Sequence, residues 1–218
     1  MKAVTLKGIH SVRQYDGHGC GCCAAAAVYR YYGLDTRSHR LRERMGTDSH
    51  FLPHGMPGRG SIQRLMLGLG WDTRGTLCPD MFAALHRDGF DISYVSGDYL
   101  RYRPLLHRHL VNGHPALALV AGMAHWLAVA GMDNAGVLVL DSSGFCDPRG
   151  EGRPRFRLGH GQFRDLACGV VFVKRNKNSR VRDMACVDDA REYARGLDFS
   201  LRCLGGALPY WMRQRAEA

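Results

Sequence analysis

Cys20, a cysteine at the start of a predicted helix, is the strongest candidate nucleophile in the sequence. The residues on either side of it, Gly19 and Gly21, have no Cβ, so backbone and substrate can come close to the thiol. An alanine-rich run that ends at Gly33 predicts a helix over residues 20–32, since alanine favours a helix and glycine commonly ends one. A thiol in the first turn lies at the positive end of the helix dipole, which favours the reactive thiolate.

Three further residues could complete a catalytic site around this thiol. A cysteine nucleophile needs a base, a group that orients the base, and donors for an oxyanion. His125 begins a predicted strand and Asp141 ends the next, so antiparallel pairing would place imidazole beside carboxylate. Gln14 precedes Cys20 in a loop that could fold its amide over the thiol. The Gln14 side chain and the Cys20 backbone N–H would then form an oxyanion hole.

A zinc site is the main alternative use of the residues around Cys20. His18, Cys20, Cys22 and Cys23 are all ligand types, but structural zinc sites space their ligand pairs more widely and need a second pair elsewhere. The remaining cysteines and histidines form no such pair. We therefore expect no metal and no cofactor, and we expect Cys22 and Cys23 to lie in the buried first turn of the helix.

The composition narrows the class of partner. The chain has 218 residues and a net charge of +10, with Lys+Arg 30 against Asp+Glu 20. A basic chain can bind nucleic acid, but these arginines are scattered through every segment and no nucleic-acid motif accompanies them. The expected partner is a peptide or protein substrate rather than nucleic acid, and the oligomeric state stays open.

The sequence also bears on cellular location and redox state. No apolar run approaches the ~20 residues that span a bilayer, and residues 1–12 lack the apolar region of a secretory signal. A cytoplasmic location is expected, or export without a conventional signal peptide. The 8 cysteines are expected to be reduced and mostly buried, because a chain of this length does not depend on disulfides.

The order of the predicted elements indicates an α+β fold, with N-terminal helices packed on a C-terminal antiparallel sheet. A catalytic domain is expected over residues 1–175. A partly helical extension over residues 176–218 would pack on it through Leu197, Leu201 and Trp211. The predicted helices cover residues 20–32, 36–46, 61–67, 80–87 and 99–111. The predicted strands cover residues 3–6, 115–121, 125–130, 137–141 and 169–173.

Taken together, these residues resemble a known family. Gln14 before Cys20-Gly21, an alanine-rich helix that ends in Tyr31-Tyr32-Gly33, and then His125 and Asp141 are similar to the papain-like cysteine peptidases. The resemblance covers residues 8–175 and is closest to the bacterial double-glycine leader peptidases, which process bacteriocin precursors. It implies that Cys20 is the nucleophile, His125 the base, Asp141 its orienting group and Gln14 the oxyanion donor.

The resemblance implies a hydrolase that cleaves a peptide, isopeptide or amide bond through a thioester. The alternatives are a non-hydrolytic papain-like module, either an acyltransferase or transpeptidase or a peptide-binding domain, and a secreted effector toxin. The chain departs from the family in carrying Ser142-Ser143 where proline usually follows the aspartate. An attached exporter module is not expected, which leaves the substrate open.

Overall fold

The computed structural model describes residues 1–34, 38–45, 47, 75–176, 191–192 and 194–204. The helix expected over residues 61–67 lies outside the described residues. The helices are α1 (Cys20–Tyr31), α2 (Ser38–Arg44), α4 (Cys78–Arg87), α5 (Tyr99–Val111) and α6 (His160–Leu166). Residues 194–204 are also helical and are called the C-terminal helix below. The strands are β1 (Val4–Thr5), β2 (Phe90–Ser96), β3 (Ala116–Val120), β4 (His125–Met132), β5 (Gly136–Leu140), β6 (Arg155–Gly159) and β7 (Ala167–Arg175).

The strands form one sheet in the order β2-β7-β3-β4-β5-β6, with β1 paired to β4. All of these pairs are antiparallel, as the sequence predicts. Three elements were not predicted: β2, β6 and α6. Strand β2 lies between α4 and α5 in the chain, so the order is not simply helices followed by sheet.

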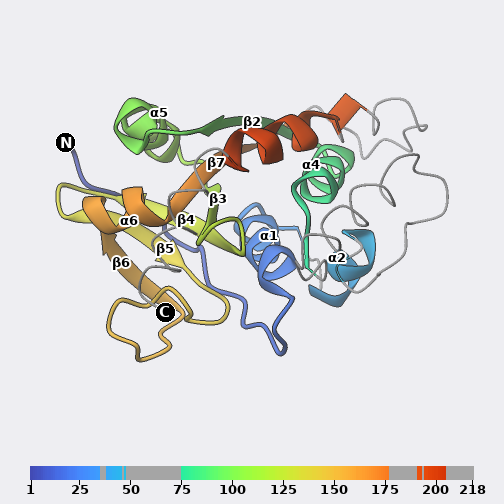
Figure 1. Ribbon diagram of the computed structural model, residues 1–218, viewed down its shortest axis with the longest axis horizontal. Helices are drawn as coiled ribbons and strands as arrows, with labels where there is room; N and C mark the ends of the chain where they lie inside the picture. Colours follow the sequence, from blue (N-terminus) through green and yellow to red (C-terminus); the bar gives the residue numbers. More distant parts are fainter. Residues whose placement is uncertain (35–37, 46, 48–74, 177–190, 193, 205–218) are drawn as a thin grey trace.

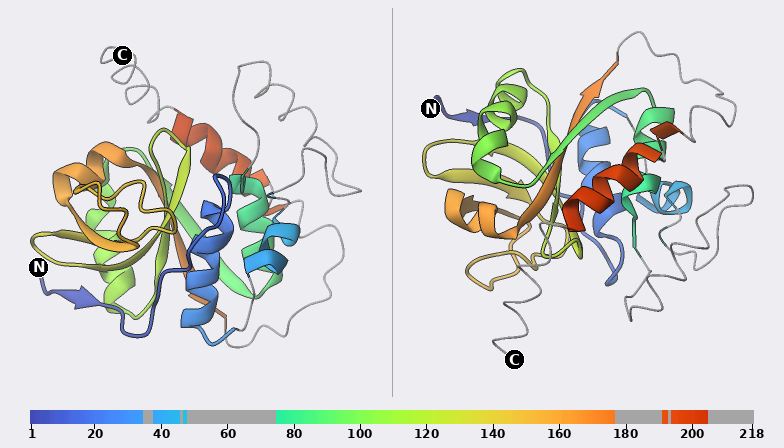
Figure 2. Two further views of the ribbon diagram at one scale, coloured as in Figure 1. Left: turned by 90° about the horizontal axis from the view of Figure 1, so that it is seen from below. Right: turned by 45° about the horizontal axis from the view of Figure 1, so that its top comes forward.

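Helices cover both faces of the sheet. Figure 1 shows α5 and α6 at the left and α1, α2 and α4 further to the right, and Figure 2 shows the same grouping from two other directions. Successive side chains of a strand point to opposite faces of the sheet, and the two groups of helices lie on these opposite faces. Phe172 of β7 contacts His109 of α5, whereas Phe90 of β2 contacts Tyr29 and Tyr32 at the α1 end. The central strands β3 and β4 are therefore buried on both faces, whereas the edge strands β2 and β6 are partly exposed.

Helix α1 is the central helix of the fold and is buried on nearly every side. Its small residues 24–27 let it lie close to β3 and β4, where larger side chains would hold it away. Gly21 lets the start of α1 lie against the segment that precedes α4, because a Cβ at this position would lie 2.4 Å from the Thr76 Cβ. The Thr76 carbonyl accepts a hydrogen bond from Trp126 of β4, so the segment beside the start of α1 is itself fixed to the sheet.

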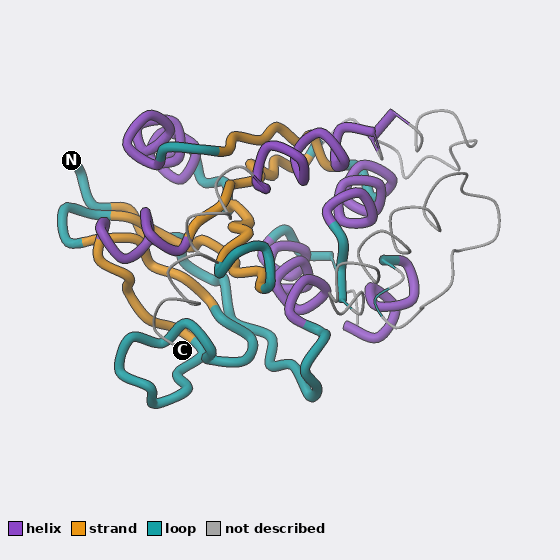
Figure 3. The backbone as a smooth tube through the Cα atoms, in the orientation of Figure 1, coloured by secondary structure: helices purple, strands orange, loops and turns teal. Residues whose placement is uncertain are grey.

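The C-terminal helix packs along β2 and α4 (Figure 3). Phe199 is fully buried, with its ring 5.6 Å from Phe82 and 5.4 Å from Tyr94. Gly169 makes room for it, since a Cβ there would lie 2.6 Å from the Phe199 ring. The expectation that Leu201 packs this segment is wrong. Leu201 is 67% exposed, because it lies on the outward side of the helix.

This packing predicts how the C-terminal helix contributes to stability. Phe199→Ala should lower the free energy of unfolding by about 3 kcal/mol, because it empties a buried aromatic site. The exposed Leu201→Ala is the matched control and should stay within about 0.5 kcal/mol of wild type. Urea denaturation followed by circular dichroism measures both. Equal stability of the two variants would contradict the packing described here.

Candidate active site

The pairing of β4 with β5 places His125 beside Asp141. The two strands run antiparallel, His125 is the first residue of β4, and Asp141 directly follows β5. Their side chains meet across this end of the hairpin, with 2.8 Å between His125 Nε2 and Asp141 Oδ1. The sequence predicted this juxtaposition from the strand order alone.

The Asp141 carboxylate has no exposed surface and is surrounded by donors. Besides His125, it accepts hydrogen bonds from the backbone N–H and hydroxyl of Ser143 and from the Cys146 N–H. Burial alone would raise its pKa, but the hydrogen bond and charge of His125, together with the two backbone donors, lower the pKa to about 2.

The ionised carboxylate fixes the tautomer of His125. Because Asp141 can only accept, Nε2 of the ring must carry a proton and donate it. In the neutral ring Nδ1 then holds the free lone pair and can take a proton from a thiol. The state of the imidazole is thus set by its buried partner.

Cys20 lies within reach of this ring, at the first position of α1. Burial alone would lower the pKa of His125. The hydrogen bond to Asp141, the hydrogen bond to Cys20 and the charges of both partners outweigh burial and raise that pKa to about 9. Cys20 is 7% exposed and His125 6%, so both groups are largely shielded from water. Such an arrangement suits proton exchange between a thiol and an imidazole.

Gln14 lies next to the start of α1. A Cβ on Gly19 would lie 3.5 Å from the Gln14 Cβ, which puts the Gln14 side chain directly beside the residue that precedes Cys20. The Gln14 Nε2 donates to the Asp16 carbonyl at 2.8 Å, and its Oε1 accepts from the Ser142 hydroxyl at 2.6 Å. The structure therefore brings all four predicted residues to one region.

Asp16 orders the loop that carries Gln14 toward α1. Its Oδ1 accepts from the backbone N–H groups of His18 and Gly19, and its Oδ2 pairs with Arg42 of α2 at 2.5 Å. Hydrogen bonds of this kind fix an otherwise irregular loop. The Gly19–Cys20 junction is thereby held in place without a side-chain cap on the helix.

Three residues that the sequence did not assign also lie at this site. Ser142 contacts Gln14, Ser143 contacts Asp141, and the Phe145 ring lies 5.8 Å from the His125 ring while remaining 68% exposed. The sequence held one signal, the Ser142-Ser143 pair after Asp141. Nothing in that pair indicated which groups the two hydroxyls would reach.

His125, Asp141 and Cys146 offer possible metal-ligand atoms within 4.8 Å of one another. The donor set does not fit a metal well. Both oxygens of Asp141 already accept hydrogen bonds, and burial raises the pKa of the Cys146 thiol to about 12. A metal ion would have to displace the bond between His125 and Asp141 and ionise a buried thiol. Every cysteine among the described residues is buried, as expected.

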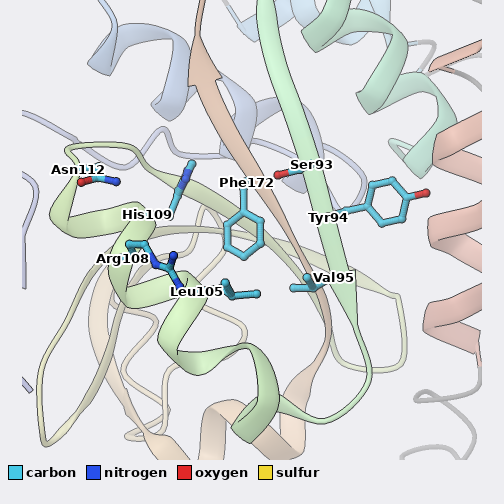
Figure 4. A pocket seen from close by; sticks show the side chains of 8 residues that line it. All are labelled: Ser93, Tyr94, Val95, Leu105, Arg108, His109, Asn112 and Phe172. Atoms are coloured by element: carbon cyan, nitrogen blue, oxygen red, sulfur yellow. The ribbon is translucent and has the colours of Figure 1, made fainter.

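A separate groove of about 330 Å³ lies between α5 and the edge strand β2. Figure 4 shows Leu105, Arg108 and His109 of α5 facing Val95 and Phe172 across it. None of the four predicted site residues lines this groove, so it is not the candidate catalytic centre.

Among the described residues, no helix is long and apolar enough to cross a bilayer.

Comparison with known proteins identifies the fold. No protein-family model matches the chain, and no curated protein matches it. The peptidase domain of Streptococcus ComA, a bifunctional ABC transporter involved in quorum sensing, matches with a TM-score of 0.52 and 17% identity. That match covers 77% of this chain and 99% of the ComA domain.

A second solved structure is a double-glycine motif protease from an AMS/PCAT transporter in complex with the leader peptide. It matches with a TM-score of 0.50 and 10% identity, over 81% of this chain and 100% of that one. At these identities the similarity shows the fold. The predicted fold class is thereby confirmed: the chain has the α+β papain-like fold, and the structures it is similar to are peptidase domains of the double-glycine branch.

Proposed function

We propose that the chain is a cysteine hydrolase that cleaves a peptide, isopeptide or amide bond through a thioester on Cys20. The observation that carries this proposal is the 2.8 Å hydrogen bond between His125 and the buried Asp141, together with the place of Cys20 at the start of α1, where it raises the pKa of His125. Each member has the chemistry its position requires: a nucleophile, a base with a fixed tautomer, and an anion that stabilises the imidazolium.

In the first half of the reaction, His125 Nδ1 takes the proton of the Cys20 thiol and the sulfur attacks the substrate carbonyl carbon. The C=O electron pair moves to the oxygen, which becomes an oxyanion. Gln14 Nε2 and the Cys20 backbone N–H donate to this oxygen. The Cys20 N–H is available because the first N–H groups of a helix have no intrahelical acceptor.

When this intermediate collapses, the C–N bond breaks and the leaving amine receives the proton held on His125. A thioester between Cys20 and the acyl group remains. In the second half, His125 takes a proton from water, the hydroxide attacks the thioester carbon, and the returning proton frees the Cys20 thiol. An amine in place of water would give acyl transfer from the same thioester.

A peptide is the substrate class that the fold similarity supports best. The AMS/PCAT protease was solved in complex with its leader peptide, and it has the same fold as this chain. Phe145 offers an exposed apolar ring beside His125, where a leaving segment would lie when it accepts its proton. A peptide with an apolar side chain after the cleaved bond suits this surface.

Cys20→Ala should abolish turnover without unfolding the protein, because it removes only the nucleophile. A loss of more than about 10³-fold in cleavage of a peptide library is expected. Cys168→Ala, which removes another buried thiol, is the matched control and should retain activity. Iodoacetamide should label Cys20 faster than the other cysteines. Residual Cys20→Ala activity within about tenfold of wild type, or uniform slow labelling, would contradict the proposal.

The rate of acylation by an amide substrate should fall in the wild type as the pH rises through about 9, because His125 then loses the proton that the leaving amine needs. This fall is the alkaline limb of the pH profile. The pKa of His125 lies above its ordinary value chiefly through Asp141 and Cys20, against the opposing effect of burial. Asp141→Asn should therefore move this limb to lower pH, since it removes the anion and leaves the burial. Stopped-flow acylation by a peptide p-nitroanilide, whose leaving group is an amine, follows the limb in both proteins from pH 5 to 10.

Asp133→Asn is the control for this shift. Asp133 follows the far end of β4 from His125, pairs with Arg157, and should leave the limb in place. An unchanged limb in Asp141→Asn would mean that another group sets the pKa of His125. Circular dichroism of each variant establishes that a shift does not come from unfolding.

A further inference from the structure

We infer that Ser142 is a positioning residue that fixes the orientation of the Gln14 carboxamide in the oxyanion hole. This inference rests on the proposed function, because it assigns Ser142 a role in stabilising the oxyanion through Gln14. It gives a function to the first residue after Asp141.

Two contacts join Ser142 to Gln14, although 128 positions separate them in the chain. The Ser142 hydroxyl donates to Gln14 Oε1 at 2.6 Å, and the Gln14 backbone N–H donates to the Ser142 carbonyl at 3.1 Å. Ser142 is buried. The hydrogen bond between the two side chains is partly buried, and such a bond holds its partner more firmly than an exposed one.

The partners of the carboxamide determine which way it faces. The Asp16 carbonyl can only accept, so the amide nitrogen of Gln14 must point toward it. Oε1 then points to Ser142, whose hydroxyl supplies the matching proton. Rotation of the amide by half a turn would place oxygen against oxygen at Asp16. The two ends of the carboxamide are therefore specified independently.

This orientation decides what the oxyanion meets. Nε2 has two hydrogens, of which one is used by Asp16 among the described residues, and the second is available to a substrate oxygen. Without the Ser142 hydroxyl, Oε1 loses its donor, and only the exposed hydrogen bond to the Asp16 carbonyl still opposes rotation of the amide about its last bond. A carboxamide oxygen turned toward the oxyanion would repel it rather than stabilise it.

Ser142 also connects the oxyanion donor to the rest of the site. It is joined by one peptide bond to Asp141, which holds His125, and Gln14 lies beside Gly19, which precedes Cys20. One short stretch of chain thus holds both the imidazole and the amide. A loss of the Ser142 hydroxyl should disturb the Gln14 amide and leave the His125 imidazole in place.

Acylation by p-nitrophenyl acetate tests this role without knowledge of the natural substrate. The Cys20 sulfur attacks the ester carbonyl, the electron pair passes through an oxyanion, and p-nitrophenolate leaves, so Cys20 carries an acetyl thioester. Alkylation by iodoacetamide is the comparison reaction. The sulfur displaces iodide from a saturated carbon, and no oxyanion forms. The ratio of the two rates isolates the oxyanion hole from the reactivity of the thiol.

Ser142→Ala should slow acylation about tenfold and leave alkylation within about twofold of wild type, since one neutral hydrogen bond is lost. Ser142→Thr keeps a hydroxyl and should restore most of the acylation rate. Ser11→Ala is the matched control. The Ser11 hydroxyl donates to the Asp141 carbonyl at 3.4 Å and does not contact Gln14, so its loss should change neither rate.

A double-mutant cycle shows whether Ser142 acts through Gln14. Gln14→Ala should slow acylation about 10²-fold, the usual cost of an oxyanion donor. Adding Ser142→Ala to Gln14→Ala should then cost nothing further, because the group that Ser142 positions is gone. A full further loss of about tenfold in the double variant would overturn the inference.

Two other results separate this inference from the proposed function. Wild-type acylation no faster than that of Cys20→Ala would overturn the proposed function and, with it, this role of Ser142. Fast wild-type acylation together with an equally fast Ser142→Ala would overturn only the role of Ser142. Equal slowing of acylation and alkylation in Ser142→Ala would also overturn it, because Ser142 would then shape the thiol or the local fold.

Discussion

The buried carboxylate of Asp141 is the constraint on which the rest of the site depends. An unpaired charge without access to water would cost several kcal/mol, so the fold must surround it with donors. One donor comes from the His125 ring at the start of β4, and the others come from the loop that follows β5, through Ser143 and Cys146. Strand register and loop path are therefore fixed by the same anion that sets the tautomer of His125.

The central helix satisfies a second requirement, which is the close approach of Cys20 to the sheet. The four alanines of α1 let the helix lie close to β4, the strand that His125 begins, and Gly21 lets the start of the helix lie against Thr76. A larger side chain at these positions would push the thiol away from the imidazole. Since even a shift of about 1 Å can cost much of a catalytic rate, packing and chemistry are coupled at this helix.

Much of this architecture could be predicted from the sequence, because its signals are local. The alanine run predicted α1, and the turn between two apolar runs placed His125 beside Asp141. Strand β6 was missed although Arg155-Phe156-Arg157-Leu158 alternates as a half-buried strand does. Strand β2 was missed because it is an edge strand between helices. The packing of Phe199 rather than Leu201 follows from where Gly169 leaves space, which no local pattern of the C-terminal helix reveals.

The contact between Gln14 and Ser142 could not be predicted for the same reason. It joins segments 128 positions apart, and its geometry depends on how the loop after β5 turns once Asp141 has its donors. Three consecutive residues have three different partners. Asp141 binds the imidazole of His125, Ser142 binds the carboxamide of Gln14, and Ser143 binds the carboxylate of Asp141. A movement of this stretch would displace the proposed base, His125, and the proposed oxyanion donor, Gln14, together. The two halves of the site, one from α1 and its preceding loop and one from the sheet, are therefore held in register by three adjacent residues.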